Sequence, residues 1–245
     1  MAVSLHCYAT ARWAEKSAAL IAEQLIEAVE RNGTATLMLA GGNTPRPLYE
    51  ALAKLTKVPW DVVYFFWGDE RVAAPDEPGS NFKMAVESLL GPLGIPSDNR
   101  RVNPMPSGGD PAQNAEQYEA RLRHIFGIAD GSTPRFDVVL LGMGDDGHTA
   151  SLFPGTKALR ETERLVVANR VAKLGTTRLT ATLRLINNAH YVALLVTGEG
   201  KADHLAAALE PGKRFPVQQV DPIHGDLVWM VDAAAGEQLA VECEE

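Results

Sequence analysis

The sequence predicts an α/β domain with an open, mostly parallel, twisted sheet and helices on both faces. Three observations carry this prediction. Short apolar segments without alternation recur along the chain, which is typical of strands that are covered on both faces. Segments with apolar residues at helical spacing lie between them. Glycine-rich or charged loops follow several of these strands, and the repeated strand–loop–helix order favours parallel pairing.

The expected strands are short apolar runs, several of which end in a polar or glycine-containing loop. They cover residues 3–8, 35–40, 62–67, 138–141, 165–169, 179–182, 191–197 and 227–231. Ligands of such sheets bind outside the carboxyl ends of the strands, so loops that leave these ends are expected to converge on one crevice.

The expected helices have apolar residues on one face and recognisable ends. A first helix follows Thr10, which we predict as its N-cap, and Asn32-Gly33 ends it. Asp110 is predicted to cap another helix that has proline at its first position. The remaining helices are expected at about residues 45–55, 81–90 and 200–209, and residues 68–80 are expected to form a polar loop.

Composition narrows the class of protein. The chain has 245 residues, of which 46% are hydrophobic and 22% charged, and this is ordinary for one globular domain over residues 1–245. The alternative is a domain with a small subdomain formed by the later strands. Cys7 and Cys243 are the only cysteines, so we expect neither a disulfide framework nor a cysteine-based metal site.

Charge and hydropathy exclude several partners. The formal net charge is −8 and there is no basic tract, so no nucleic-acid or membrane partner is expected. Residues 1–8 lack the pattern of a signal peptide, and no run of apolar residues is long enough to span a bilayer. A cytoplasmic location is therefore expected. An anionic small molecule remains compatible with the charge, because attraction from locally clustered cations acts over a few ångströms.

A glycine-rich loop follows the second expected strand, with the sequence Ala-Gly-Gly-Asn-Thr-Pro at residues 40–45. Gly41 and Gly42 let the backbone approach a ligand closely, and Thr44 offers a hydroxyl group. The helix that follows presents unpaired N–H groups and the positive end of its dipole. These features favour phosphate, with Asn43 a weaker candidate contact. The alternative is a plain strand-to-helix turn.

Charged residues directly follow the third expected strand, in the sequence Trp-Gly-Asp-Glu-Arg at residues 67–71. Such side chains are costly beside a buried strand unless they are paired or used. Asp69 and Arg71 are therefore expected at the crevice, where Arg71 binds an anionic group. The alternative is a solvated loop with a surface ion pair.

Glycines, two acids and a histidine follow the fourth expected strand, at residues 142–155. Asp146 and His148 are close enough on a tight loop to face one another. The carboxylate then orients the imidazole and supports its positive form while it takes a proton from water. His148 is therefore the candidate general base, whereas the other histidines are interpreted as structural or merely exposed.

Two later cations complete the set of candidate site residues. Arg178 lies near the start of a strand-like segment and Lys201 at the start of a helix, and both are able to reach a phosphate at the carboxyl edge of the sheet. Each also has an ordinary interpretation as a solvated surface residue. No metal-ligand spacing is present, so we expect no metal and no cofactor.

Four blocks of this sequence resemble the 6-phosphogluconolactonase family, within the glucosamine-6-phosphate isomerase/lactonase superfamily. They extend over nearly the whole chain, and the third is very specific. In order, the blocks are AGGNTP at 40–45, DER to SN at 69–81, GMGDDGHTASLFPG at 142–155 and RLTAT to TGEGK at 178–201. The first differs from the family's usual SGGSTP, and Ala73-Ala74 stand where the family often has Val-Pro.

The resemblance implies a Rossmann-like, glucosamine-6-phosphate isomerase-like fold and hydrolysis of 6-phospho-D-glucono-1,5-lactone to 6-phospho-D-gluconate, in the oxidative pentose phosphate pathway. His148 is then the base toward water, Asp146 orients it, and Arg71 serves either the oxyanion or the phosphate. Asp69 contacts sugar hydroxyls or holds Arg71. A monomer or small homo-oligomer that binds a sugar phosphate is expected. The phosphate contacts are assigned to Gly41, Gly42, Asn43, Thr44, Arg178 and Lys201.

Two other functions remain as alternatives. The related isomerase/deaminase branch shares the Asp-Gly-His core but usually has Asn-Glu-Pro where this chain has Leu152-Phe153-Pro154. Phe153 does not titrate, so the sequence favours the lactonase. A non-catalytic sugar-phosphate sensor is the second alternative, but such regulators usually carry a DNA-binding segment, for which the sequence before Val3 leaves no room.

Overall fold

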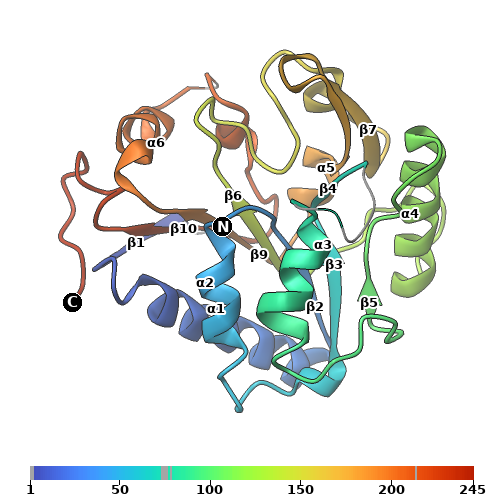
Figure 1. Ribbon diagram of the computed structural model, residues 1–245, viewed down its shortest axis with the longest axis horizontal. Coiled ribbons are helices and arrows are strands. Elements are labelled where there is room, and N and C mark those ends of the chain that lie inside the picture. The colour runs from blue at the N-terminus through green and yellow to red at the C-terminus, as the bar shows by residue number, and fades with distance from the viewer. Residues whose placement is uncertain (1–2, 73–76, 78, 213) are drawn as a thin grey trace.

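The computed structural model describes residues 3–72, 77, 79–212 and 214–245, so Ala73-Ala74 lie outside the described residues. A parallel seven-stranded sheet forms its centre, in the order β1-β10-β9-β6-β2-β3-β5 (Figure 1). The expected α/β class is confirmed. Its strands are β1 (Val3–Tyr8), β2 (Ala35–Leu39), β3 (Val63–Trp67), β5 (Val102–Asn103), β6 (Val138–Gly142), β9 (Tyr191–Val196) and β10 (Asp226–Asp232).

A second, three-stranded sheet contains β4 (Asp69–Arg71), β8 (Thr176–Ala181) and β7 (Val166–Val171). All its pairs are antiparallel. The expectation of a polar loop over residues 68–80 is therefore wrong at residues 69–71, because β4 finds a partner in β8, which lies more than a hundred residues further along the chain. Long-range pairing of this kind leaves no local signal in so short and polar a segment.

Helices pack against the parallel sheet, and α1 lies beside α2 (Figure 1). The predicted capping role of Thr10 is wrong, since Arg12 occupies the N-cap position and makes no side-chain capping bond. Gly33 ends the helix in the left-handed conformation (φ 75°), as expected. The helices are α1 (Trp13–Asn32), α2 (Pro45–Leu52), α3 (Asn81–Ala85), α4 (Pro111–Phe126), α5 (Leu183–Ile186) and α6 (Ala202–Leu209).

Two predicted helix boundaries have clear structural outcomes. Asp110 accepts hydrogen bonds from the N–H groups of Ala112 (2.8 Å) and Gln113 (3.0 Å), which confirms it as the N-cap of α4. The helix expected at residues 81–90 begins at Asn81 but continues beyond Ala85 as one π-helical turn over Val86–Leu90. None of the helices in the described part of the chain is long and apolar enough to cross a membrane.

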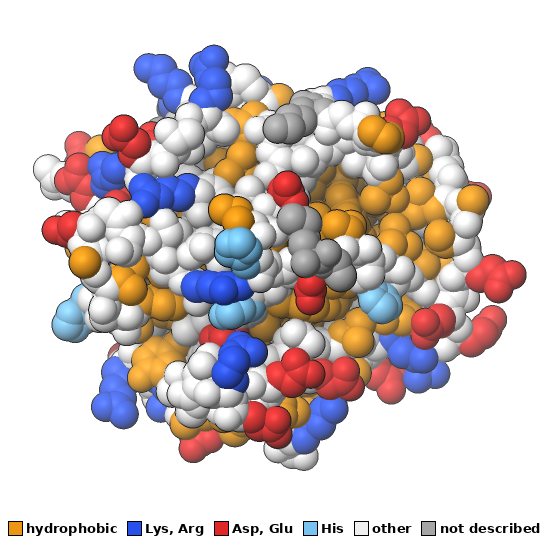
Figure 2. Space-filling model, turned by 180° about the vertical axis from the view of Figure 1, so that it is seen from behind, with side chains coloured by type: hydrophobic (Ala, Val, Ile, Leu, Met, Phe, Trp, Pro, Cys, Tyr) orange, Lys and Arg blue, Asp and Glu red, His pale blue; other side chains and the backbone are white. Residues whose placement is uncertain are grey.

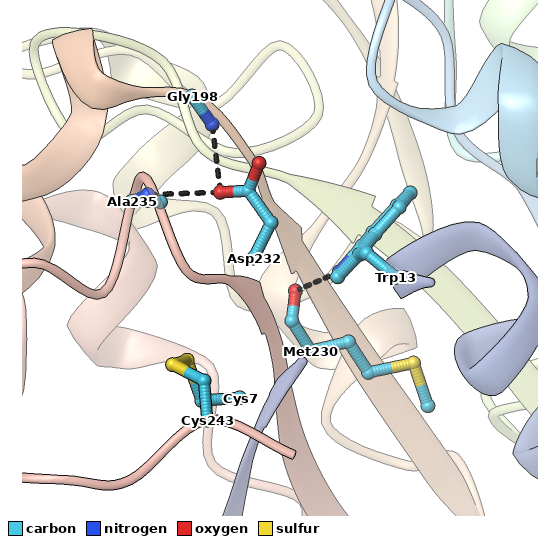
Figure 3. The surroundings of a disulfide bond; sticks show 7 residues. All are labelled: Cys7, Trp13, Gly198, Met230, Asp232, Ala235 and Cys243. Carbon is cyan, nitrogen blue, oxygen red and sulfur yellow. Dashed lines mark hydrogen bonds between the residues drawn. A yellow bond between two sulfur atoms is a disulfide. The ribbon is translucent and has the colours of Figure 1, made fainter. Parts of the chain in front are cut away.

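A disulfide joins Cys7 of β1 to Cys243 in the C-terminal tail (Figure 3). This corrects the expectation drawn from the cysteine count. The tail runs beside the edge strand β1, where Glu244 donates its N–H to Cys7 O and accepts that of Ala9, both at 2.8 Å. Since the bond closes a loop of 236 residues, chain-entropy arguments assign it about 5 kcal/mol of stabilisation through the unfolded state.

Glu119 of α4 anchors the small sheet to the rest of the molecule. Its buried carboxylate pairs with Arg123 (2.7 Å) and Arg164 (3.1 Å) and accepts the N–H of Leu165 (3.0 Å). Burial works to raise the pKa of Glu119, but the hydrogen bonds from Arg123, Leu165 and Arg164 outweigh it and hold the pKa below its ordinary value.

A depressed folded-state pKa has a predictable effect on stability. The contribution of Glu119 is present above the unfolded pKa, about 4.3, and is lost as the pH falls through the lower folded value. Glu119→Gln should lower the free energy of unfolding at neutral pH by about 2 kcal/mol and make it less pH-dependent in acid. Urea unfolding between acidic and neutral pH measures both effects, and Glu50→Gln, at an exposed position on α2 away from Arg164, is the control. Equal acid sensitivity of Glu119→Gln and the unmodified protein would contradict this account.

Candidate active site

One cavity of about 330 Å³ lies at the carboxyl edge of the parallel sheet, where the loops after β2, β3, β6 and β9 meet. The structure therefore brings the motif-bearing loops together. All the predicted site residues line this cavity except Asp146, which lies behind His148. The predicted residues on its wall are Gly41, Gly42, Asn43, Thr44, Asp69, Arg71, His148, Arg178 and Lys201.

The Asp146 and His148 side chains are in direct contact. Nδ1 of His148 lies 2.5 Å from Oδ1 of Asp146, and the backbone N–H of His148 donates to the same oxygen at 3.2 Å. The loop is closed by a hydrogen bond from Gly144 N–H to the carbonyl of His148 (2.8 Å). Because Nδ1 is engaged by a carboxylate, the ring is held as the Nδ1–H tautomer and Nε2 is the nitrogen left to accept a proton.

Two glycines allow this loop to close around the imidazole. A Cβ on Gly144 would lie 2.0 Å from the His148 ring, so no larger residue fits beneath the ring without displacing it. Gly147 has φ 70°, and a Cβ there would meet Phe215 at 2.5 Å. These glycines therefore set the position of the histidine as well as the shape of the turn.

Phe153 packs against the imidazole. Its buried ring stacks on that of His148, with centroids 4.0 Å apart and an interplanar angle of 22°. Arg178 and Lys173 lie 5.8 and 5.7 Å from the Phe153 centroid, within the range of cation–π contacts. The histidine plane is thus defined by packing as well as by its hydrogen bond.

Asp146 remains ionised over a wide pH range. Partial burial works to raise its pKa, but hydrogen bonds from Lys173 and His148 outweigh burial and lower the pKa to about 2. A carboxylate that stays charged is suited to orient an imidazole and to stabilise its protonated form.

Asp69 holds three segments together. Its carboxylate accepts hydrogen bonds from Ser151 Oγ (2.6 Å) and Asn81 Nδ2 (3.0 Å), so it joins β4 to the start of α3 and to the histidine loop. It makes no hydrogen bond or ion pair with Arg71 within the described residues, so the expectation that Asp69 holds Arg71 is wrong. Asp69 also lines the cavity.

Arg71 and Arg178 face each other across β4 and β8, where they form a directly opposed pair. Both line the cavity, and in the described part of the chain neither guanidinium pairs with a carboxylate. Burial lowers the pKa of Arg178, and Arg71 lowers it further, whereas Asp69 and Glu70 oppose the shift. Directly opposed like charges are destabilising, so this pair favours an anion in the cavity.

A third cation, Lys201, lies across the cavity on the loop after β9. Its ammonium group contacts the exposed Asp145 carboxylate and lines the cavity wall. The loop is held by buried Asp232, which accepts the N–H groups of Gly198 (2.9 Å) and Ala235 (2.8 Å), as Figure 3 shows. Thr44 reaches this loop through a hydroxyl–hydroxyl contact of 3.2 Å with Thr197.

The positive charge of the site is local. On the face shown in Figure 2, basic and acidic side chains are interspersed and hydrophobic side chains gather in a hollow on one side. Within the cavity itself, the cations available to attract an anion are Arg71, Arg178 and Lys201. Among the described residues, no cluster of three or more His, Cys, Asp or Glu side chains is arranged to hold a metal ion.

Two residues of the site were missed by sequence reasoning. Asn81 lines the cavity and packs so closely on Gly41 that a Cβ there would lie 1.8 Å from its amide oxygen. Its place in the Ser-Asn pair after the charged strand was the available signal. Lys173, on a turn between β7 and β8, contacts Asp146, and no motif pointed to it.

Known proteins resemble this chain over most of its length. A sequence model of the family described as glucosamine-6-phosphate isomerases/6-phosphogluconolactonase matches residues 9–229. The chain belongs to this family. It is 42% identical to a 6-phosphogluconolactonase of Synechocystis, over 92% of this chain and 93% of the relative, and 43% identical to one of Nostoc with the same coverage.

Solved structures of the family share the fold. The 6-phosphogluconolactonase from Thermotoga maritima superposes with a TM-score of 0.81 at 30% identity, covering 94% of this chain and 99% of that one. The enzyme from Trypanosoma cruzi gives 0.84 at 28% identity, with 98% and 99% covered. The family is thus established over nearly the whole chain.

Proposed function

We propose that this protein hydrolyses 6-phospho-D-glucono-1,5-lactone to 6-phospho-D-gluconate. The observation that carries the proposal is the Asp146–His148 pair at the wall of a cavity that also presents three cations. A δ-lactone is an activated ester, so the reaction needs an oriented water, a base and stabilisation of an oxyanion, and it needs no covalent nucleophile. The relatives named above carry the same activity in their names.

His148 acts as the base toward water. As the water oxygen attacks the lactone carbonyl carbon, Nε2 takes a water proton, and Asp146 stabilises the imidazolium that forms. Collapse of the tetrahedral intermediate breaks the bond between this carbon and the ring oxygen. The imidazolium then returns its proton to the leaving ring oxygen, which becomes a hydroxyl group of the product.

The cations divide between the two ends of the substrate. Arg178 lies beside Phe153, on which His148 stacks, and Arg71 is its cross-strand partner. We therefore assign both guanidinium groups to the negative charge that develops at the carbonyl oxygen, which changes the sequence-based assignment of Arg178 to the phosphate. Lys201, Thr44 and the backbone of Gly42 hold the 6-phosphate at the start of α2.

The function is tested by measuring enzyme-dependent loss of the lactone, with the spontaneous rate subtracted. The 6-phosphorylated lactone should be consumed far faster than the unphosphorylated one at the same pH. Ammonia release from glucosamine 6-phosphate would instead support the isomerase/deaminase alternative. Binding of 6-phosphogluconate without lactone hydrolysis would support a sensor.

Lys201→Met should chiefly weaken substrate capture. Loss of one charge-assisted contact to phosphate should lower kcat/KM by about 10- to 100-fold, mostly through KM, because the phosphate is remote from the reacting carbon. Lys57→Met is the control. It removes the same charge from an exposed position before β3, at the amino ends of the strands and away from the cavity. An unchanged KM in Lys201→Met would remove this residue from the phosphate site.

A further inference from the structure

Among the described residues, Lys173 is the one group outside the histidine loop that contacts Oδ2 of Asp146, the oxygen that does not face His148. The two oxygens of this carboxylate have different partners: Oδ1 faces Nδ1 and the backbone N–H of His148, and Oδ2 contacts the ammonium group of Lys173. The lysine lies on the turn that joins β7 to β8, so the contact connects the small sheet to the histidine loop that follows β6.

The turn that carries Lys173 is well defined. It follows β7 as a 3-10 turn over Ala172–Leu174 and ends at Gly175, in the left-handed conformation (φ 64°). Arg170 donates to the carbonyl of Gly175 at 3.0 Å and closes the turn. The Lys173 ammonium group also lies 5.7 Å from the centroid of Phe153, the ring on which His148 stacks.

These contacts restrict rotation of the Asp146 carboxylate. Rotation of an aspartate carboxylate about its last bond is soft, and the imidazole follows the oxygen to which Nδ1 is bonded. A cation on Oδ2 restricts that rotation and keeps Oδ1 directed at His148. Lys173 does not line the cavity, so it acts on the reaction through Asp146 and not through the substrate.

We propose that Lys173 is a positioning residue, which fixes the Asp146 carboxylate and thereby the ring of His148. The proposal rests on the function proposed above, in which His148 is the base. The small sheet thus supplies the two arginines that line the cavity, and the turn between two of its strands supplies the lysine that holds Asp146.

Lys173→Met tests the proposal, because methionine keeps most of the aliphatic stem beside Phe153 and removes the charge. The side chain of Lys173 is 58% exposed, so its ion pair with Asp146 is partly screened by water. We expect loss of this pair to decrease kcat by about 5-fold. KM for the phosphorylated lactone should stay unchanged. Lys173→Arg should restore kcat, and Lys57→Met should behave as the unmodified protein.

An NMR measurement separates positioning from a general loss of stability. The Nδ1–H resonance of His148 is identified by its loss in His148→Asn. We expect it to shift and to exchange faster with water in Lys173→Met, and to return in Lys173→Arg. An unchanged kcat, a change confined to KM, or an unchanged resonance in Lys173→Met would each overturn the proposal. Full activity of His148→Asn would instead refute the proposed base, whatever Lys173 does.

Discussion

Replacing His148 with asparagine should lower kcat for the phosphorylated lactone by about 10²- to 10⁴-fold, the usual contribution of a general base. Asparagine is polar and is able to hydrogen-bond Asp146, but it does not take up a proton from water. The hydrogen bond of 2.5 Å to Asp146 and the stacked Phe153 ring hold the histidine in one orientation.

The measurement requires the spontaneous hydrolysis rate to be subtracted and the fold to be checked by thermal unfolding. Binding of 6-phosphogluconate should be retained, because the groups assigned to the phosphate are unchanged. His224→Asn, at an exposed position near the start of β10, is the matched control and should keep full activity. Turnover of His148→Asn equal to that of the control would remove the imidazole from the mechanism.

Gly144→Ala should reduce activity about 10²-fold without removing any functional group. The added methyl group would lie 2.0 Å from Cε1 and 2.1 Å from Nδ1 of the His148 ring, closer than real contacts allow, so the ring must move. A displacement of about 1 Å at a reacting group is enough for a loss of this size. The assay is the same lactone hydrolysis, with kcat and KM determined separately.

Gly200→Ala is the steric control, since a Cβ at that exposed position, which is not on the cavity wall, meets no atom within 4 Å. It should leave the His148 resonance in place and reduce kcat far less than Gly144→Ala. Equal kcat values for the two variants would show that the space beneath the imidazole does not determine its position.

Local chemistry made much of this molecule predictable. The apolar runs at residues 35–40 and 138–141 form strands as expected, because each is short, continuous and followed by a polar loop. Asp110 and Gly33 act as caps because their roles depend only on neighbouring backbone groups. The contact of Asp146 with His148 was predictable for the same reason, since both residues lie on one short loop.

The sequence by itself therefore determined the class of fold, the loops at the carboxyl edge and the histidine pair, because these follow from periodicity and short-range hydrogen bonding. Only the tertiary structure decided the pairing of β4 with β8, the Cys7–Cys243 bond and the contact of Lys173 with Asp146. Each of these joins segments that are distant along the chain. These contacts form only when the folded sheets bring the two segments together. A local pattern of residues does not predict which distant segment will be the partner.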